Sequence, residues 1–268
     1  DAGKTWIYRG TAQGLEIDWG HNTFWAPEVF YSETDQKYHM IVTYIRGVPK
    51  TWSEPKQGRN GMVHYMSENL WQWKFQNFIF DQENLDIIDA CVYTLGAGNW
   101  RMWYRDTEKG CAIYAADTCD FMHFTQPVLA VPGHAEGPNV FSLGGIYWMV
   151  TDPLGERQGL AVYKSEDLRI WQKQPENILT QTGERPFDDS KGRHADVVTL
   201  GDSSYIFYFT QPYKDYKQQS GFEKIQDRQA ICIVQCAHLR AEHGSLCCDR
   251  NEDFQISLSE EGTKNEKT

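Results

Sequence analysis

The strongest constraint on the fold is an internal repeat that occurs four times along the chain. The copies read WAPEVFYSETDQKYHMIVTY from Trp25, IDACVYTLGAGNWRMWYRD from Ile88, EGPNVFSLGGIYWMVTDP from Glu136 and HADVVTLGDSSYIFYFTQP from His194. In each copy a short motif leads to a valine at the fifth position, then to a turn and an alternating aromatic segment. Alternation with a period of two on both sides of a Gly-, Asp- or Ser-rich turn predicts a β-hairpin.

A second motif closes three of the copies. It has the pattern Ser/Thr-x-x-Leu/Phe-x-x-Trp/Phe and ends at Trp73, Phe124 and Trp171. This pattern predicts a third strand, a polar turn and a fourth strand, so each copy forms four antiparallel strands over about 50–60 residues. Such units are typical of the blades of a β-propeller. No sustained 3.6-residue periodicity supports a helical solenoid, and a two-sheet sandwich leaves the repeat unexplained.

We therefore expect an all-β fold, a five-bladed β-propeller in one domain over residues 1–258. The predicted complete blades cover residues 25–80, 88–130, 136–180 and 194–258, and a polar, disordered tail covers 259–268. The opening DAGKTWIYRG matches the end of the second motif, which predicts that residues 1–10 are the last strand of a first blade that is largely missing. The alternative is a four-bladed ring in which residues 4–10 pair with the last blade, near 230–237 or 254–258.

Charge and composition exclude several classes of partner. The net charge of -11 argues against nucleic acid and anionic membranes, which need a cationic surface. No apolar run approaches the roughly 20 residues that span a bilayer. The 7 cysteines lack the pairing of a disulfide framework or the spacing of a zinc site, so they are interpreted as buried thiols. Because Asp1 is not a natural start, we expect an extracellular or periplasmic monomer whose leader was removed, with a cytoplasmic location open.

The four opening motifs predict a common site. The innermost strands of propeller blades start on one face, so Trp25, Asp89, Glu136 and His194 are expected to ring one pocket, with Trp25, Glu136 and His194 in register. Two carboxylates, an imidazole and an aromatic ring converging on one axis suit acid–base chemistry on a sugar.

The order W-A-P-E, I-D-A-C-V, E-G-P-N-V and G-R-H-A-D-V-V resembles glycoside hydrolase family 43, the five-bladed propeller arabinofuranosidases and xylosidases. The resemblance covers roughly residues 1–212. It implies an inverting, exo-acting hydrolase of α-L-arabinofuranosides or β-xylosides in plant-type polysaccharides, with an oligosaccharide or polysaccharide as its partner.

The resemblance also implies a role for individual residues. Glu136 matches the general acid, and Asp89 matches the aspartate that tunes and orients that acid, although Ala90 stands where proline is usual. Trp25 would shape the sugar subsite and Arg193 would bind the sugar. His194 would be the channel histidine, near a water or a calcium ion in the central channel. No cofactor is required.

The general base has no match in this sequence and is expected upstream of Asp1. Inverting hydrolysis needs a protonated and an ionised carboxyl about 6.5–9.5 Å apart. We expect Asp89 and partial burial to keep Glu136 protonated, because both disfavour its charged form. Asp18 is the one nearby carboxylate considered as a replacement base. The alternatives are a non-catalytic glycan-binding propeller that lacks its base and a sialidase, since DAGKTW resembles an Asp-box.

Overall fold

A computed structural model describes residues 5–17, 22–47, 60–81, 85–154, 159–188, 191–200, 203–212 and 232–256. The predicted tail 259–268, Asp18 and residues 1–4 lie outside these ranges. The chain divides into two compact units, described separately below: the first unit is Tyr8–Pro138, and the second unit is Asp1–Ile7 with Asn139–Thr268. The prediction of one domain over 1–258 stays a prediction.

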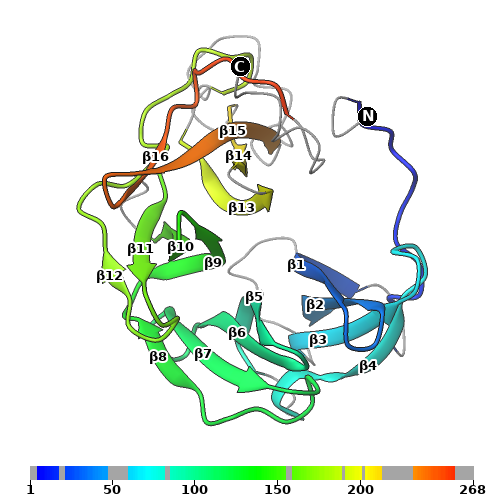
Figure 1. The fold of residues 1–268 in the computed structure, drawn as a ribbon. Coiled ribbons are helices and arrows are strands. Elements are labelled where there is room, and N and C mark those ends of the chain that lie inside the picture. The colour runs from blue at the N-terminus through cyan, green and yellow to red at the C-terminus, as the bar shows by residue number, and fades with distance from the viewer. Residues whose placement is uncertain are drawn as a thin grey trace. The chain divides into compact units, whose positions relative to one another are not determined.

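The first unit holds two four-stranded antiparallel sheets, each with its strands in chain order. The first sheet consists of β1 (Asn22–Ser32), β2 (Lys37–Arg46), β3 (Asn60–Ser67) and β4 (Lys74–Phe78). After the short 3₁₀ helix η1 (Ile79–Asp81), the second sheet consists of β5 (Ile87–Gly96), β6 (Asn99–Asp106), β7 (Ala112–Thr118) and β8 (Val128–Val131). Figure 1 shows the strands of each sheet side by side. None of the helices in the described ranges has the length and apolar character that crossing a bilayer requires.

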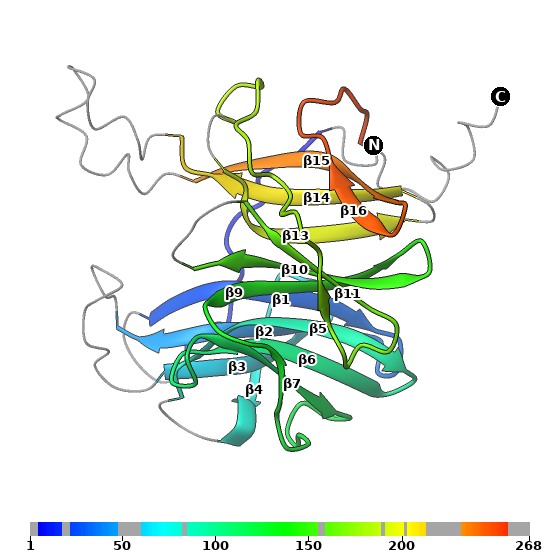
Figure 2. The same ribbon diagram turned by 90° about the vertical axis from the view of Figure 1, so that its left-hand side faces the viewer.

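Two further sheets of the same kind follow in the second unit. The third consists of β9 (Ala135–Leu143), which begins in the first unit, β10 (Ile146–Pro153), β11 (Ala161–Ser165) and β12 (Gln172–Lys173). The fourth consists of β13 (Arg193–Leu200), β14 (Ser203–Thr210), β15 (Ile233–Glu242) and β16 (Ser245–Cys248), and Figure 2 shows β13, β14 and β15 one above another.

Neighbouring sheets within each unit share a hydrophobic core. In the first unit Ile41 and Met62 pack in one cluster with Trp100 of the next sheet. In the second unit Trp148 of β10 packs in one cluster with Ile206 of β14. Each such side chain contributes about 1.5–3 kcal/mol when it is fully buried. Four-stranded meanders packed face on face are propeller blades, so the predicted all-β propeller fold with four complete blades is confirmed.

The second sequence motif forms the turn between the third and fourth strands. In three blades an Asn or Asp accepts hydrogen bonds from two backbone N–H groups two and three residues further on: Asn69, Asp120 and Asp167. The next residue has a positive φ, of 64° at Leu70, 57° at Phe121 and 61° at Leu168. The side-chain oxygen thus stabilises a left-handed backbone position that a leucine or phenylalanine otherwise avoids.

The prediction of a strand over residues 1–10 is wrong for the part that is described. Residues 5–10 form no strand, and Trp6, Ile7 and Tyr8 are 72%, 71% and 84% exposed. The first pairing comes later, as an isolated parallel bridge between Gln13 and Gln72. The physical reason is that alternating aromatic residues form a strand only where a neighbouring strand takes up their backbone groups.

A row of polar side chains with two buried histidines, His39 and His64, crosses the first sheet. His39 Nε2 lies 3.0 Å from Asp35 Oδ2, and His39 Nδ1 lies 2.9 Å from His64 Nε2. His64 Nδ1 in turn faces Asn77 Oδ1 at 3.4 Å. Burial and the neighbouring His39 lower the pKa of His64 to about 4, although the Asn77 hydrogen bond opposes this. His64 is therefore a buried, neutral imidazole at neutral pH.

This pKa predicts an acid-sensitive stability. Between pH 6.5 and about 4 the unfolded chain binds a proton at His64 that the folded chain does not, so stability falls as the pH falls through this window. The loss attributable to His64 is on the order of 3 kcal/mol. His64→Gln, which keeps a hydrogen-bonding side chain, should flatten the dependence when unfolding by urea is compared at pH 4.5 and 7. If the free energy of unfolding changes equally between these two pH values in His64→Gln and in the unmodified protein, the prediction is wrong.

Candidate active site

The innermost strand of each blade is irregular near its start. The pairing shifts between Trp25 and Glu28 in β1, between Ile88 and Cys91 in β5, and between Arg193 and Asp196 in β13. The residue after the first of each pair has a positive φ: 44° at Ala26, 59° at Asp89 and 40° at His194, with 56° at Gly137 in β9. The same backbone conformation therefore begins every inner strand.

This backbone register corrects the sequence alignment of the fourth copy. The irregularity aligns Arg193, not His194, with Trp25 and Ile88. It likewise aligns Val197, not Val198, with Val92. The sequence could not distinguish the two valines, because both satisfy the apolar pattern and only the backbone conformation differs.

A repeated side-chain contact joins the inner strands of adjacent blades within each unit. The Val92 N–H donates to Glu28 Oε1 at 2.7 Å, and the Val197 N–H donates to Asn139 Oδ1 at 3.1 Å. Glu28 and Asn139 occupy the same place in their blades, two residues after the residue with a positive φ. Because β5 and β13 are edge strands of their sheets, a polar oxygen at this position accepts an N–H of the strand edge.

Asp89 lies at the head of β5 and is only 5% exposed. Its N–H donates to Thr43 Oγ1 at 3.3 Å, and its Oδ2 accepts the Gly137 N–H at 3.0 Å. Aspartate tolerates the left-handed conformation better than most residues do. Asp89 therefore anchors the backbone of β9 directly beside Glu136, and its role in orienting the acid stays a prediction.

The Glu136 side chain contacts a cation that the sequence analysis did not identify. Glu136 Oε2 lies 3.0 Å from Arg105 Nη1, with the two side chains 27% and 14% exposed. Arg105 stands on β6 opposite Ile88. The sequence feature that could have identified Arg105 is its position directly after the aromatic residues of the run MWYRD. A guanidinium at this distance favours the ionised carboxylate, which opposes the expectation that its surroundings keep Glu136 protonated.

The structure brings three of the predicted residues into one unit. Trp25 is half-buried on β1 opposite Thr43, the residue whose hydroxyl accepts the Asp89 N–H. Trp25, Asp89 and Glu136 are thus linked through neighbouring strands of the first unit. The Asp89 carboxylate accepts a backbone N–H, that of Gly137, and the Glu136 carboxylate pairs with the Arg105 cation.

Arg193 and His194 belong to the second unit, so their convergence with Glu136 stays a prediction. Arg193 pairs with Phe209 across β13 and β14, and the His194 ring lies 6.5 Å from the Phe209 ring. Among the described residues no group of three or more His, Cys, Asp or Glu could hold a metal ion. The water or calcium ion expected near His194 stays a prediction, and no chemistry is assigned to a metal.

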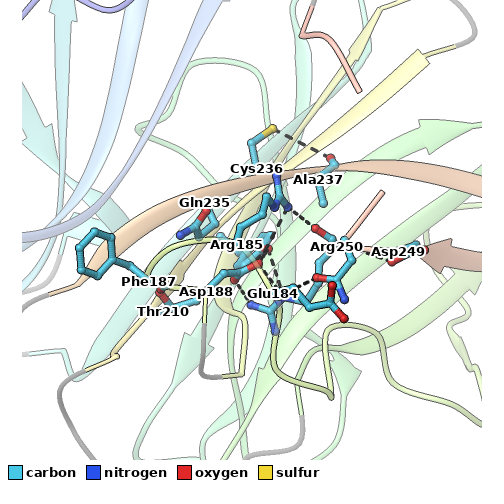
Figure 3. Close-up of polar contacts among 12 residues, drawn as sticks. Glu184, Arg185, Phe187, Asp188, Thr210, Gln235, Cys236, Ala237, Asp249 and Arg250 are labelled. Carbon is cyan, nitrogen blue, oxygen red and sulfur yellow. Dashed lines mark hydrogen bonds and ion pairs between the residues drawn. The ribbon is translucent and has the colours of Figure 1, made fainter. Parts of the chain in front are cut away.

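A buried ion pair fixes the segment that leads to Arg193. Asp188 is fully buried and pairs with Arg250, which is 4% exposed. Tyr208 also donates to Asp188, at 3.1 Å, and burial raises the pKa of Tyr208 to about 12, so its hydroxyl keeps its proton. Figure 3 shows Arg250 and Arg185 gathered around Asp188. Asp188 therefore serves structure, and substrate and solvent do not reach it.

These features define the class of protein. The chain is a β-propeller in which the inner strands β5 and β9 carry the carboxylates Asp89 and Glu136, and the neighbouring strand β6 carries the guanidinium of Arg105. No profile of a known protein family matches the sequence, and a search of curated proteins found no significant match.

Solved structures show which propellers share the fold. A thermostable family-43 glycoside hydrolase is 19% identical, with a TM-score of 0.63 over 88% of this chain and 78% of that one. An α-L-arabinofuranosidase from Lactobacillus brevis is 16% identical, with a TM-score of 0.61 over 88% and 78%. An endo-1,4-β-xylanase from Bacteroides thetaiotaomicron is 17% identical, with a TM-score of 0.60 over 89% and 77%. The resemblance to family 43 is thus confirmed at the level of the fold.

The contacts of Asp89 predict separable effects of its charge and its hydrogen bond. Asp89→Asn keeps an oxygen for the Gly137 N–H and tolerates the positive φ, so it should change the free energy of unfolding by less than about 1 kcal/mol. Asp89→Ala loses the acceptor and should cost about 1–3 kcal/mol. Urea unfolding at neutral pH measures both, and an alanine variant as stable as the asparagine variant would contradict this account.

The buried ion pair predicts a large loss on removal of one partner. Arg250→Met leaves the Asp188 carboxylate buried with one cation fewer and should destabilise the protein by about 3–5 kcal/mol. Arg240 provides a matched control, because its pair with Glu252 is 38% and 28% exposed. Arg240→Met should cost no more than about 1 kcal/mol. Equal losses in the two variants, measured by thermal and urea unfolding, would argue against a structural role of Asp188.

Proposed function

We propose that the protein is an inverting, exo-acting glycoside hydrolase of α-L-arabinofuranosides or β-xylosides. The observation that carries the proposal is the pair Asp89 and Glu136, in which the buried Asp89 carboxylate binds the N–H of the residue that follows Glu136. This places a partly exposed carboxyl on a rigid strand, as a proton donor requires. The fold is that of enzymes named for arabinose- and xylose-containing substrates.

In this proposal Glu136 donates its proton to the glycosidic oxygen as the bond to the leaving group breaks. A second, ionised carboxyl removes a proton from water on the opposite face of the sugar, about 6.5–9.5 Å away. We infer that this base is a carboxyl outside the described residues. Trp25 offers an aromatic face to the sugar, and Arg193 and His194 are proposed to bind its hydroxyl groups.

The ion pair between Glu136 and Arg105 favours a second candidate function. A carboxylate held at 3.0 Å from a guanidinium is an acceptor for sugar hydroxyl groups, and it is not a proton donor in that state. The alternative is therefore a glycan-binding propeller without turnover. Calorimetry with arabino- and xylo-oligosaccharides distinguishes this function from hydrolysis. Binding without hydrolysis by the full-length protein supports the alternative.

Substitution of Glu136 tests the proposed acid. Glu136→Gln should lower kcat/KM on an arabino- or xylo-oligosaccharide by about 10²–10⁴, because the sugar leaving group needs a proton. The loss should be much smaller on a p-nitrophenyl glycoside, whose leaving group departs without one. Both rates are measured side by side at the pH optimum.

Glu28→Gln is the matched control for this experiment, because glutamine keeps the oxygen that accepts the Val92 N–H. It should retain activity on both substrates. If Glu136→Gln turns over the oligosaccharide as fast as the unmodified protein, Glu136 is not the acid.

A further inference from the structure

We propose that Arg105 is the positioning residue of this site: it orients the Glu136 carboxylate and holds it ionised in the substrate-free protein, and so sets the pH range in which Glu136 donates a proton. The catalytic part of this inference rests on the proposed function. The effect of Arg105 on the charge of Glu136 does not, and it can be measured in a protein that hydrolyses nothing.

The first observation is the ion pair itself. Arg105 Nη1 donates to Glu136 Oε2 at 3.0 Å, and with exposed fractions of 14% and 27% both side chains are largely removed from water. Partial burial lowers the effective dielectric constant and strengthens the attraction between the charges. A proton on Glu136 removes this attraction, so the pair disfavours protonation.

The second observation is that one turn holds both partners. Cys111 Sγ accepts a hydrogen bond from Arg105 Nη2 at 3.1 Å, and the Cys111 carbonyl accepts the Ala135 N–H at 3.0 Å. Ala135 immediately precedes Glu136, so the guanidinium and the backbone of the carboxylate share an anchor. Their separation is therefore set by the turn between β6 and β7, and neither residue can drift from the other without breaking that turn.

The third observation concerns the opposite side of Glu136. Arg105 pairs with Ile88, the residue before Asp89, and Asp89 binds the Gly137 N–H. Asp89 thus fixes the backbone of Glu136, and Arg105 fixes its side chain. Arg105 Nε is buried and has no hydrogen-bond partner among the described residues, so the contacts with Glu136 and Cys111 orient the guanidinium.

The direction of the effect follows from the charges. An adjacent opposite charge favours the ionised form of a carboxyl, typically by 1–3 pH units. Without the Arg105 charge, Glu136 should hold its proton to higher pH. A general acid works only while it is protonated, so the alkaline limb of the pH profile of kcat/KM should move upward with it.

The experiment follows the Glu136 carboxyl by ¹³C NMR of the full chain with labelled glutamate, assigned with Glu136→Gln. In Arg105→Met the titration midpoint should rise by about 1–3 pH units. Arg105→Lys, which keeps the charge and loses the planar fork, should raise it by less. If Arg105→Met does not fold, Arg105→Gln, which removes the charge and keeps hydrogen-bond donors, replaces it, and a midpoint unchanged from that of the unmodified protein overturns the inference.

Arg101→Met is the matched control. Arg101 lies on the same strand, about 13 Å along it from Arg105, and forms a comparable ion pair with Asp117 at 2.6 Å. Its substitution should leave the Glu136 midpoint unchanged. An equal shift in Arg101→Met and Arg105→Met would show a general change of net charge and would overturn the role of Arg105.

Kinetics separate this inference from the proposed function. If the unmodified protein with its upstream sequence hydrolyses no glycoside, the proposed function fails while the NMR titration still tests Arg105. If it does hydrolyse and Glu136→Gln is inactive, the alkaline limb in Arg105→Met should shift by the same amount as the NMR midpoint. A limb that stays in place in that active enzyme overturns the inference and leaves the proposed function standing.

Discussion

The left-handed residue at the head of each inner strand is the constraint on which the candidate site depends. A positive φ in a non-glycine residue costs roughly 1–2 kcal/mol, and it reverses the direction in which the next groups point. In β5 it turns the Asp89 carboxylate toward Gly137, and in β9 it occurs at Gly137 itself, whose N–H meets that carboxylate at 3.0 Å. The hydrogen bonds of Asp89 offset the energetic cost of its positive φ. That same backbone conformation directs its N–H and its carboxylate toward their partners.

The position of Arg105 explains how the site holds two carboxylates, Asp89 and Glu136. Two carboxylates close together repel each other unless one is protonated or a cation lies beside them. Here Arg105 is that cation, because its strand faces the residue before Asp89 and its side chain reaches Glu136. The site is therefore built to keep Glu136 charged until something displaces Arg105. A sugar whose hydroxyl groups accept hydrogen bonds from the guanidinium is a chemically suited displacer.

The sequence predicted what depends on local patterns. Alternating aromatics and Asx turns at Asn69, Asp120 and Asp167 define four blades because both signals act within a few residues. Arg105 was missed because its partner is 31 positions away in the sequence, and no local pattern marks that contact. The register of Val197 was missed for a related reason, since the bulge decides which of two adjacent valines is equivalent to Val92, and the apolar pattern is the same for both. Residues 5–10 have the alternating pattern of a strand but form none, because the pattern alone does not supply a strand to pair with.

Burial distinguishes the ion pair at Asp188 from the ion pair at Glu136 by what each can do. Asp188 is fully buried among Arg250, Tyr208 and neighbouring backbone, so its charge cannot change without a large loss of stability. Glu136 keeps 27% of its side chain exposed beside a cation on a fixed anchor. A carboxyl that water and a ligand can reach, yet whose charge the protein controls, can exchange a proton during a reaction. The same pairing of Arg with a carboxylate thus fixes Asp188 as a buried structural group and leaves Glu136 accessible to water and ligands.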